Sequence, residues 1–499
     1  MHSSLWLTLL IVVPLLGALG AGLARAREGV SYVIAVVAAS VEMVLTIAVV
    51  ALYNNHIANA QTFDFAYRVV LSAPFGLAYD VALDGISLLM VVLTSLVVLL
   101  ALLGARDRRR EGAFVAWLLM LTSFTMGSFV AHDLLEFFIF FELTLVPCYF
   151  IISQWGGRER SRAALKFFVY TFAGSAFLFV GLLFLGFAHQ HQVGGNLTFA
   201  YSVLSSTVLS HSTSVWLFVA FAIAFAVKSP IWPLHTWSPL TYAEAPTAGS
   251  IELSALLAKL GSYGLLRFAV GLFPLALSTM RPVVLTLAVI GIIYGSALAA
   301  VTPDLKRLVA YSSLAQMGFI TLGIVTGSKI AMVGAVLLMF NHGVITIGFF
   351  LLIGFIEQRR SSATIADLKG LQGPAPVLAA LFTVVMMASI GLPGLSGFVS
   401  EYLILIGAFA THAWWAVGAT SGVVLAALYL LWAYQRVFHG RGEGANAEVS
   451  DATGRERWVF APIVLLIVLL GVFPQPVLSR ITPSVQQVIE HVAPAGVNK

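Results

Sequence analysis

Charged side chains are scarce in this sequence. Only 10% of its 499 residues are Asp, Glu, Lys or Arg, whereas a soluble domain carries roughly 25%. Hydrophobic residues make up 60% of the chain, and the mean hydropathy is +0.96. This composition excludes an ordinary water-soluble globular protein.

Cysteine is almost absent as well. The single Cys148 excludes an internal disulfide and an iron–sulfur cluster held by this chain alone. No glycine-rich phosphate loop follows a strand pattern. The eleven histidines are enough in number for a haem-ligating pair, but the two inside apolar runs, His235 and His342, each stand alone. We therefore expect no redox chemistry in this chain itself.

Long apolar runs are what the sequence has instead. Each has about 20 residues, enough to cross a hydrocarbon core of about 30 Å as a helix. The runs predict an all-α polytopic membrane protein that forms a single integral-membrane domain over 1–499. The first run is not expected to be a cleaved signal peptide, because its basic residues follow the apolar stretch. Fourteen spans are predicted, at 3–23, 31–53, 84–104, 112–130, 133–153, 163–188, 214–241, 246–272, 282–302, 304–326, 330–356, 374–410, 413–435 and 458–478.

Basic residues gather on one side of these spans. The loops after odd-numbered spans are rich in arginine and lysine, whereas the other loops hold few. The positive-inside rule then places both termini on the outer side of the cytoplasmic membrane. The net charge of +5 reflects this topology and requires no nucleic-acid partner. We expect 440–457 to be a solvated cytoplasmic loop, and the outer segment 54–83 to form a small β-hairpin.

Four ionisable residues lie deep inside predicted spans: Glu142, Lys228, Lys259 and Glu401. A charge at mid-membrane costs at least about 2.5–3.5 kcal/mol. These residues either join helices through buried ion pairs or carry out a function, and we favour function because buried pairs are poor stabilisers. Arg267 lies near the outer end of its span, where we expect either snorkelling to the surface or burial, without preference.

Two of the spans contain helix breakers. Pro230 and Pro233 interrupt span 7 in "AVKSPIWPLHTW", and "GLPGLSG" at 391–397 interrupts span 12. Lys228 ends one half-helix and Glu401 begins another, as the helix dipole favours. Broken spans five apart predict inverted repeats. The repeats are spans 4–8 at 112–272 and spans 9–13 at 282–435, with spans 1–3 in 1–111 and span 14 at 458–478.

Protons suit such a site better than larger solutes. A carboxylate near a buried lysine favours its charged form, so movement of Glu142 could switch Lys228 between holding and releasing a proton. His235 lies about two turns beyond Lys228 if the helix resumes, and His342 lies in mid-span. A single buried histidine is more often a core residue. In a row with two lysines and Glu401, we favour a proton relay.

These residues belong to motifs that resemble a known family. The motifs include "FFELTLVPCYFIISQWGGRERSRAALKFFVYT" (140–171), "AVKSPIWPLHTWSPLTYAEAPTAGSIELSALLAKLGSYGLLRF" (226–268), "NHGVITIGFFLLIGFIEQR" (341–359) and "GLPGLSGFVSEYLILIGAF" (391–409). They resemble the antiporter-like subunits of respiratory complex I, NADH-quinone oxidoreductase, and most closely its subunit M, the chain-4 type. Glu401 points to subunit M, because sister subunits and antiporter relatives usually carry lysine at that position.

The resemblance implies a fourteen-helix proton channel with discontinuous helices 7 and 12 and no cofactor of its own. FMN, iron–sulfur clusters and quinone are expected in partner subunits, and the partners are other membrane-arm subunits, including sister antiporter-like subunits.

By motif, the resemblance implies that Glu142 pairs with Lys228, that His235 connects to Lys259, and that His342 leads to Glu401 as the terminal carrier. One residue departs from the pattern, because Gln316 stands where the family commonly has histidine.

Three alternatives stay open at this point. The chain could belong to a multisubunit Na⁺/H⁺ antiporter, although Glu401 disfavours this. It could belong to a membrane-bound hydrogenase or a related complex, whose electron donor would bind elsewhere. A purely structural scaffold is disfavoured by the four mid-membrane charges.

Overall fold

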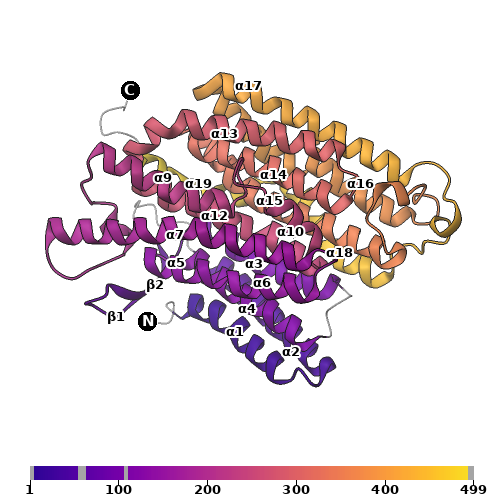
Figure 1. Cartoon of the computed structure of the whole chain (residues 1–499), viewed down its shortest axis with the longest axis horizontal. Helices are drawn as coiled ribbons and strands as arrows, with labels where there is room; N and C mark the ends of the chain where they lie inside the picture. Colours follow the sequence, from indigo (N-terminus) through magenta and orange to yellow (C-terminus); the bar gives the residue numbers. More distant parts are fainter. Residues whose placement is uncertain (1–4, 54–62, 106–110, 493–499) are drawn as a thin grey trace.

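Long helices packed side by side make up most of the described chain (Figure 1). The structure is a computed structural model that describes residues 5–53, 63–105 and 111–492. Its helices and strands are α1 (Trp6–Leu23), α2 (Glu28–Leu52), β1 (Asp64–Ser72), β2 (Leu77–Leu83), α3 (Gly85–Gly104), α4 (Gly112–Val130), α5 (Leu134–Leu143), α6 (Leu145–Trp155), α7 (Arg160–Val193), α8 (Tyr201–Leu204), α9 (His211–Lys228), α10 (Ser238–Glu244), α11 (Thr247–Glu252), α12 (Ala258–Gly264), α13 (Pro274–Val301), α14 (Leu305–Val325), α15 (Lys329–Arg360), α16 (Pro376–Ile390), α17 (Ser396–Phe438), α18 (Gly454–Val472) and α19 (Gln475–Val492). Two π-helical turns, η1 (Leu253–Leu257) and η2 (Leu265–Val270), flank α12.

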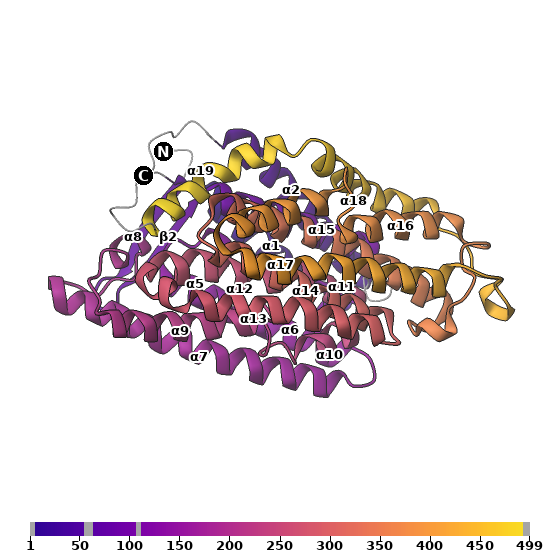
Figure 2. The same cartoon turned by 90° about the horizontal axis from the view of Figure 1, so that it is seen from above.

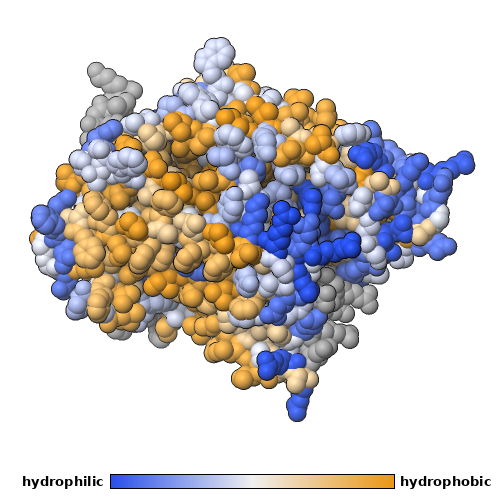
Figure 3. All heavy atoms as spheres, viewed as in Figure 1, coloured by the Kyte–Doolittle hydropathy of each residue, from blue (hydrophilic) through white to orange (hydrophobic). Residues whose placement is uncertain are grey.

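The described part of the chain is a polytopic membrane fold, as predicted. It contains 12 helices long and apolar enough to cross a membrane, or up to 13 if the bent pair α18 and α19 is one span. Hydrophobic atoms cover much of one face, whereas hydrophilic atoms gather toward the right-hand end, where the loop after α17 lies (Figure 3). This distribution suits a protein whose middle faces hydrocarbon.

Two spans form the centre of the molecule. One is the span Thr247–Val270, which contains α11, η1, α12 and η2, and the other is α15. The apolar stretch of each is wholly buried, whereas most of the apolar stretch of α1, α2 and α7 is not buried. Figure 2 shows α7 along one edge of the helix array and α19 toward the opposite edge. Polar groups on the two central spans are therefore shielded from lipid on all sides by other helices.

The outer segment contains the predicted hairpin. Strands β1 and β2 pair antiparallel, with Arg68 opposite Asp80, while residues 54–62 of the predicted segment lie outside the described residues. Asp84 follows β2 and caps α3, because its carboxylate accepts the amide N–H groups of Ile86 and Ser87. It also forms a buried ion pair with Arg267 of η2. Arg267 therefore does not snorkel to the surface.

Both predicted helix breaks are present. Helix α9 ends at Lys228 and α10 begins at Ser238, with Pro230 and Pro233 between them. Helix α16 ends at Ile390 and α17 begins at Ser396, and Gly391 between them has a φ of +81°, which glycine adopts without strain.

A third break was not predicted. The span 133–153 is divided at Thr144 into α5 and α6. Pro147 lacks an N–H group and its ring crowds the carbonyl of Leu143, which explains the interruption. Helix α17 runs through two predicted spans, but His412 has non-helical angles of φ −144° and ψ 62°, so the helix is kinked where the spans were expected to separate.

The loop 440–457 is anchored more firmly than a solvated loop. Asp451 accepts the N–H groups of Val377 (3.1 Å) and Leu378 (3.0 Å) at the start of α16. Burial alone would raise the pKa of Asp451, but the N–H groups of Ala452, Leu378 and Val377, with Arg457, lower it below its ordinary value. The loop therefore caps the start of α16, although the long helix α17 lies between them in the sequence.

Replacing Asp451 with alanine is expected to destabilise the protein by about 1 kcal/mol, as the loss of a helix cap does. Because the folded pKa is lowered, the ionised carboxylate stabilises the fold above its unfolded pKa of about 3.9, and this contribution disappears as the pH falls through the folded pKa. The measurement is the thermal unfolding midpoint in detergent at pH 7 and at acid pH. Asp451→Asn, which keeps one acceptor oxygen, should lose less. An equal effect of both variants at both pH values would contradict the capping role.

Candidate functional site

A line of polar side chains crosses the buried centre of the molecule. We call it the polar axis and define it as Glu142, Lys228, Lys259, His342, Gln316 and Glu401. It draws these residues from α5, α9, α12, α15, α14 and α17. Apart from Glu142, which is half-buried, all of them are buried.

Lys228 is the last residue of α9, where exposed carbonyls favour a cation. Its ammonium donates hydrogen bonds to the hydroxyl of Thr144 (2.9 Å) and the carbonyl of Phe141 (3.3 Å), and lies 4.3 Å from the centre of the Phe141 ring. Thr144 is the residue at the break between α5 and α6, and Phe141 lies in the last turn of α5. The break that the sequence did not predict therefore supplies the oxygen atoms that hold this lysine.

Glu142 stands between those two partners, but it is not bonded to Lys228. Among the described residues, no carboxylate forms an ion pair with Lys228 within 4.0 Å, and Glu142 Oε1 has no hydrogen-bond partner. The two charges are near enough to influence each other. The structure thus places the predicted pair side by side with the ion pair open.

Lys259 lies directly against His342, at the centre of the axis. The Nζ–Nδ1 distance is 2.5 Å, and Nζ also donates to the carbonyl of Ser254 at 2.7 Å. Ser254 belongs to the π-helical turn η1, whose wider turn occurs next to this lysine. Neither ring nor ammonium reaches solvent. The direct partner of Lys259 is therefore His342, and the connection from His235 to Lys259 that the family resemblance implied stays a prediction.

His235 occupies a different place, between α9 and α10. It lines a polar cavity of about 340 Å³ that also contains Lys166, Tyr294 and Arg307. Its ring lies 5.3 Å from that of Tyr294, and its Nδ1 has no partner among the described residues. Arg162 and Arg307 in this cavity belong to the basic side of the protein. His235 thus faces an open polar cavity on that side.

Glu401 lies against the break that precedes α17. Its Oε1 accepts a hydrogen bond from the side-chain amide of Gln316 at 2.8 Å. A Cβ atom at Gly391 would lie 2.8 Å from its Oε2, so the turn packs directly on the carboxylate. Next to His342 in α15, the side-chain amide of Asn341 donates to the carbonyl of Ser396, the first residue of α17, at 2.7 Å. These contacts connect the central span α15 to the second broken helix.

Two residues of interest were missed by the sequence reasoning, and a third, Gln316, was noted but not counted among the predicted site residues. Gln316 contacts Glu401 directly, and its signal was its departure from the family pattern. Glu42 and Glu252 are completely buried, and neither carboxylate has a hydrogen-bond partner among the described residues. Each is an acidic residue inside an apolar run, "AASVEMVLTI" and "GSIELSALLA", so the same signal that revealed Glu142 was present for both.

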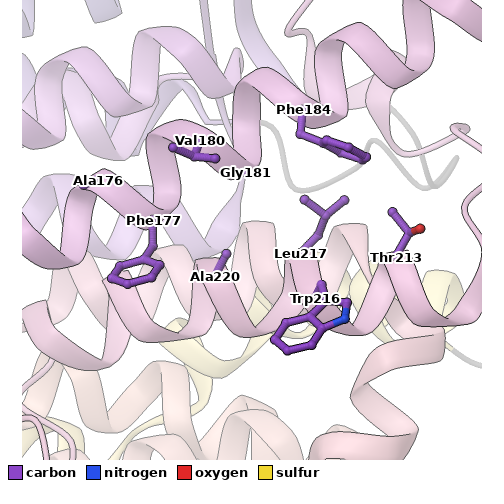
Figure 4. A pocket seen from close by; sticks show the side chains of 9 residues that line it. All are labelled: Ala176, Phe177, Val180, Gly181, Phe184, Thr213, Trp216, Leu217 and Ala220. Atoms are coloured by element: carbon purple, nitrogen blue, oxygen red, sulfur yellow. The ribbon is translucent and has the colours of Figure 1, made fainter.

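A groove of about 560 Å³ between α7 and α9 is lined by apolar side chains such as Phe177, Phe184 and Trp216 (Figure 4). Thr213 is the one polar residue in its lining, and no ionisable residue lines it. Within the described ranges, no three His, Cys, Asp or Glu side chains converge on a position that could hold a metal ion.

Comparison with known proteins shows what this fold is similar to. Residues 131–428 match the family described as NADH:quinone oxidoreductase/Mrp antiporter, TM. A chain of respiratory complex I from Thermus thermophilus with bound NADH superposes with a TM-score of 0.86 and 32% identity, covering 97% of this chain and 100% of that one. A chain of the Mrp complex from Dietzia sp. has a TM-score of 0.83 but 20% identity, over 99% of both chains, and shows the fold alone.

The sequence is also similar to NADH-quinone oxidoreductase subunit M from Rhodobacter capsulatus. The two are 41% identical over 424 residues, which cover 83% of each chain. Together with the family match, this identity over most of both chains shows that the chain belongs to the subunit M family of NADH-quinone oxidoreductase, the antiporter-like subunits of respiratory complex I.

Proposed function

We propose that this chain moves protons across the membrane as a membrane-arm subunit of an NADH:quinone oxidoreductase, and that the polar axis is its path. The observation that carries the proposal is the contact between Lys259 and His342 in the buried centre, with Lys228 on one side and Glu401 on the other. Ionisable groups are expensive at this depth and mark proton relays. The chain itself performs no redox step in this proposal.

Protons enter this path from the basic side. The cavity that contains His235 leads from that side toward the break after Lys228. When Glu142 moves toward Lys228, the charged lysine is favoured. When it moves away, as in the open arrangement seen here, Lys228 releases its proton. Moving one proton against 100 mV costs about 2.3 kcal/mol, which a change in the geometry of one ion pair can supply.

The second half of the path runs from Lys259 to Glu401. A charged Lys259 gives its proton to His342 Nδ1, which leaves a neutral amine and a charged imidazole. The imidazolium then protonates Glu401, and the resulting neutral acid releases the proton to the outer side. Gln316 cannot carry a proton, but its amide N–H group holds the Glu401 carboxylate in place.

The proposed topology has fourteen spans, with helices 4–8 and 9–13 as inverted repeats and both termini on the outer side of the cytoplasmic membrane. The kink at His412 separates spans 12 and 13 of this topology within α17. The repeats are supported by the two breaks, because Lys228 lies beside one and Glu401 beside the other.

The proposed partners are the other membrane-arm subunits, including sister antiporter-like subunits, and the lipid bilayer. FMN, the iron–sulfur clusters and quinone would be bound by partner subunits. Oxidation of NADH there would drive the rearrangement that opens and closes the pair of Glu142 and Lys228.

A second candidate is a subunit of a Na⁺/H⁺ antiporter, because the Mrp complex shares this fold. The test uses sealed inverted vesicles from cells that lack the chain and from cells that express it. NADH-driven acidification and quinone reduction should both be restored by the chain. Restoration of Na⁺- or K⁺-driven proton exchange alone would favour the antiporter. Restoration only with an electron donor other than NADH would favour a hydrogenase-type complex.

A further inference from the structure

Two buried acids lie outside the proposed path. Glu42 on α2 and Glu252 at the end of α11 are both 0% exposed. None of their four carboxylate oxygens has a hydrogen-bond partner among the described residues. An ionised carboxylate in such a place loses its hydration without compensation, which is far more costly than burying the neutral acid. At least one of the two therefore carries a proton.

The two acids come from neighbouring parts of the helix array. Helix α3 packs against both α2 and α11. One turn from Glu42 on α2, Thr46 is hydrogen-bonded to Ser95 of α3 at 2.6 Å, which fixes how α2 faces α3. The carboxyl groups are close enough that ionisation of Glu252 acts on Glu42. Because like charges repel in a buried site, the two cannot both be ionised at low cost.

Glu252 also lies on the same wholly buried span as Lys259 of the polar axis. It precedes Lys259 by seven residues on the same buried span, with the π-helical turn η1 between them, which corresponds to about 10 Å along the helix axis. Helix α11, which Glu252 ends, packs against α6, which contains Cys148. The amide of Cys148 donates to the carbonyl of Thr144, whose hydroxyl holds Lys228. A route from Lys228 to Lys259 along these contacts passes Glu252.

We propose that Glu252, coupled to Glu42, is a proton-carrying site that connects Lys228 to Lys259. This inference rests on the proposed function and adds a site to it. In the first step, the O–H bond of the Glu252 acid breaks and its proton binds the neutral amine of Lys259, leaving a carboxylate and an ammonium. In the second step, an N–H bond of charged Lys228 breaks and its proton restores the Glu252 acid. Repulsion from Glu42 ensures that only one of the two acids is ionised at a time.

Glu252→Gln is the decisive variant, because the amide keeps the size of the acid but carries no exchangeable proton of this kind. In vesicles with assembled complex, we expect proton pumping to fall about tenfold or more, as the loss of a proton-transfer group does. Infrared difference spectra should lose a C=O band of a protonated carboxyl group. Glu448→Gln, at an exposed loop position, is the matched control and should change neither measurement.

A merely structural role predicts a different pattern. It would lower the amount of assembled complex on a native gel but leave pumping per complex and the infrared band unchanged, and that result would overturn the inference. If Glu252→Gln does not assemble, Glu42→Gln decides. It should shift the remaining carboxyl band of Glu252, and an unshifted spectrum would refute the coupling.

Lys259→Ala, measured in parallel, distinguishes a failure of this inference from a failure of the proposed function. Loss of pumping in Lys259→Ala with native pumping in Glu252→Gln overturns the inference alone. Native pumping in both variants overturns the proposed function as well.

Discussion

Replacing Lys259 with alanine is expected to abolish proton pumping and quinone reduction together. The side chain is completely buried, and its ammonium is the direct neighbour of His342. Alanine removes one of the two proton-carrying groups at the centre of the polar axis, leaving His342 without a donor, and takes away the hydrogen bond to the Ser254 carbonyl. We expect a loss of at least about 100-fold, because general acid–base groups contribute 10²- to 10⁴-fold. Quinone reduction falls too, because in a coupled complex it cannot proceed without proton movement.

Two further variants make this experiment specific. Lys259→Arg keeps a positive charge, but arginine does not release its proton in proteins, so we expect it to be inactive as well. A merely electrostatic role would instead be rescued by arginine. Lys329→Ala, at the exposed start of α15, is the control for loss of a lysine and should leave both rates unchanged.

The measurement uses sealed inverted vesicles and a native gel for assembly. Native rates in an assembled Lys259→Ala complex would refute the relay. Intact NADH oxidation with loss of Na⁺- or K⁺-driven exchange would show that the chain is an antiporter subunit.

The sequence was sufficient to identify charged residues of the axis. Lys228 and Lys259 interrupt apolar runs, and a single charge in such a run stands out whatever the tertiary structure is. The breaks near Lys228 and Glu401 were equally visible, because proline and clustered glycine act locally on the backbone. For the same reason, the hairpin at β1 and β2 was predicted from its own residues.

The partners of these residues could not be predicted in the same way. Lys259 and His342 are 83 positions apart, and only the packing of α12 near α15 decides that they meet. The family resemblance implied that His235 connects to Lys259 but did not indicate that His235 lines the cavity on the basic side. Likewise, the break at Thr144 provides the oxygen that binds Lys228, although each residue alone looks like part of a continuous helix.

Arg267 is another residue whose partner could not be predicted from the sequence near it. Its position near a span end suited either snorkelling or burial, and the outcome depended on Asp84, which lies 183 residues away. The N-cap signal of Asp84 was local, but its second role as the partner of an arginine was not.

Gln316 changes how the outer half of the axis works. Where relatives commonly have histidine, its amide can only donate and accept hydrogen bonds, and it gives one N–H group to Glu401. In the proposed path, the proton then passes from His342 to Glu401 without a titratable group at this position. In this proposal, Glu401 alone takes up and releases the proton in the last step.

Glu401→Gln is accordingly expected to stop proton release to the outer side. The amide fits beside Gly391 and Gln316, where the carboxylate now lies, so the helix break should persist. Because an amide cannot take up the proton, we expect pumping to fall at least about 100-fold, with quinone reduction falling alongside it.

Variants of Gln316 test whether Glu401 carries the proton or only joins two helices. Gln316→Leu removes the hydrogen bond but keeps the acid, so pumping should fall by about tenfold or less, the effect of losing one hydrogen bond of ordinary strength. Gln316→His offers a second proton-carrying group and should keep pumping near the native rate. The rates are measured per assembled complex in inverted vesicles. If Gln316→Leu were as inactive as Glu401→Gln, the contact between the two side chains, and not the acid, would be the essential feature of this end of the axis.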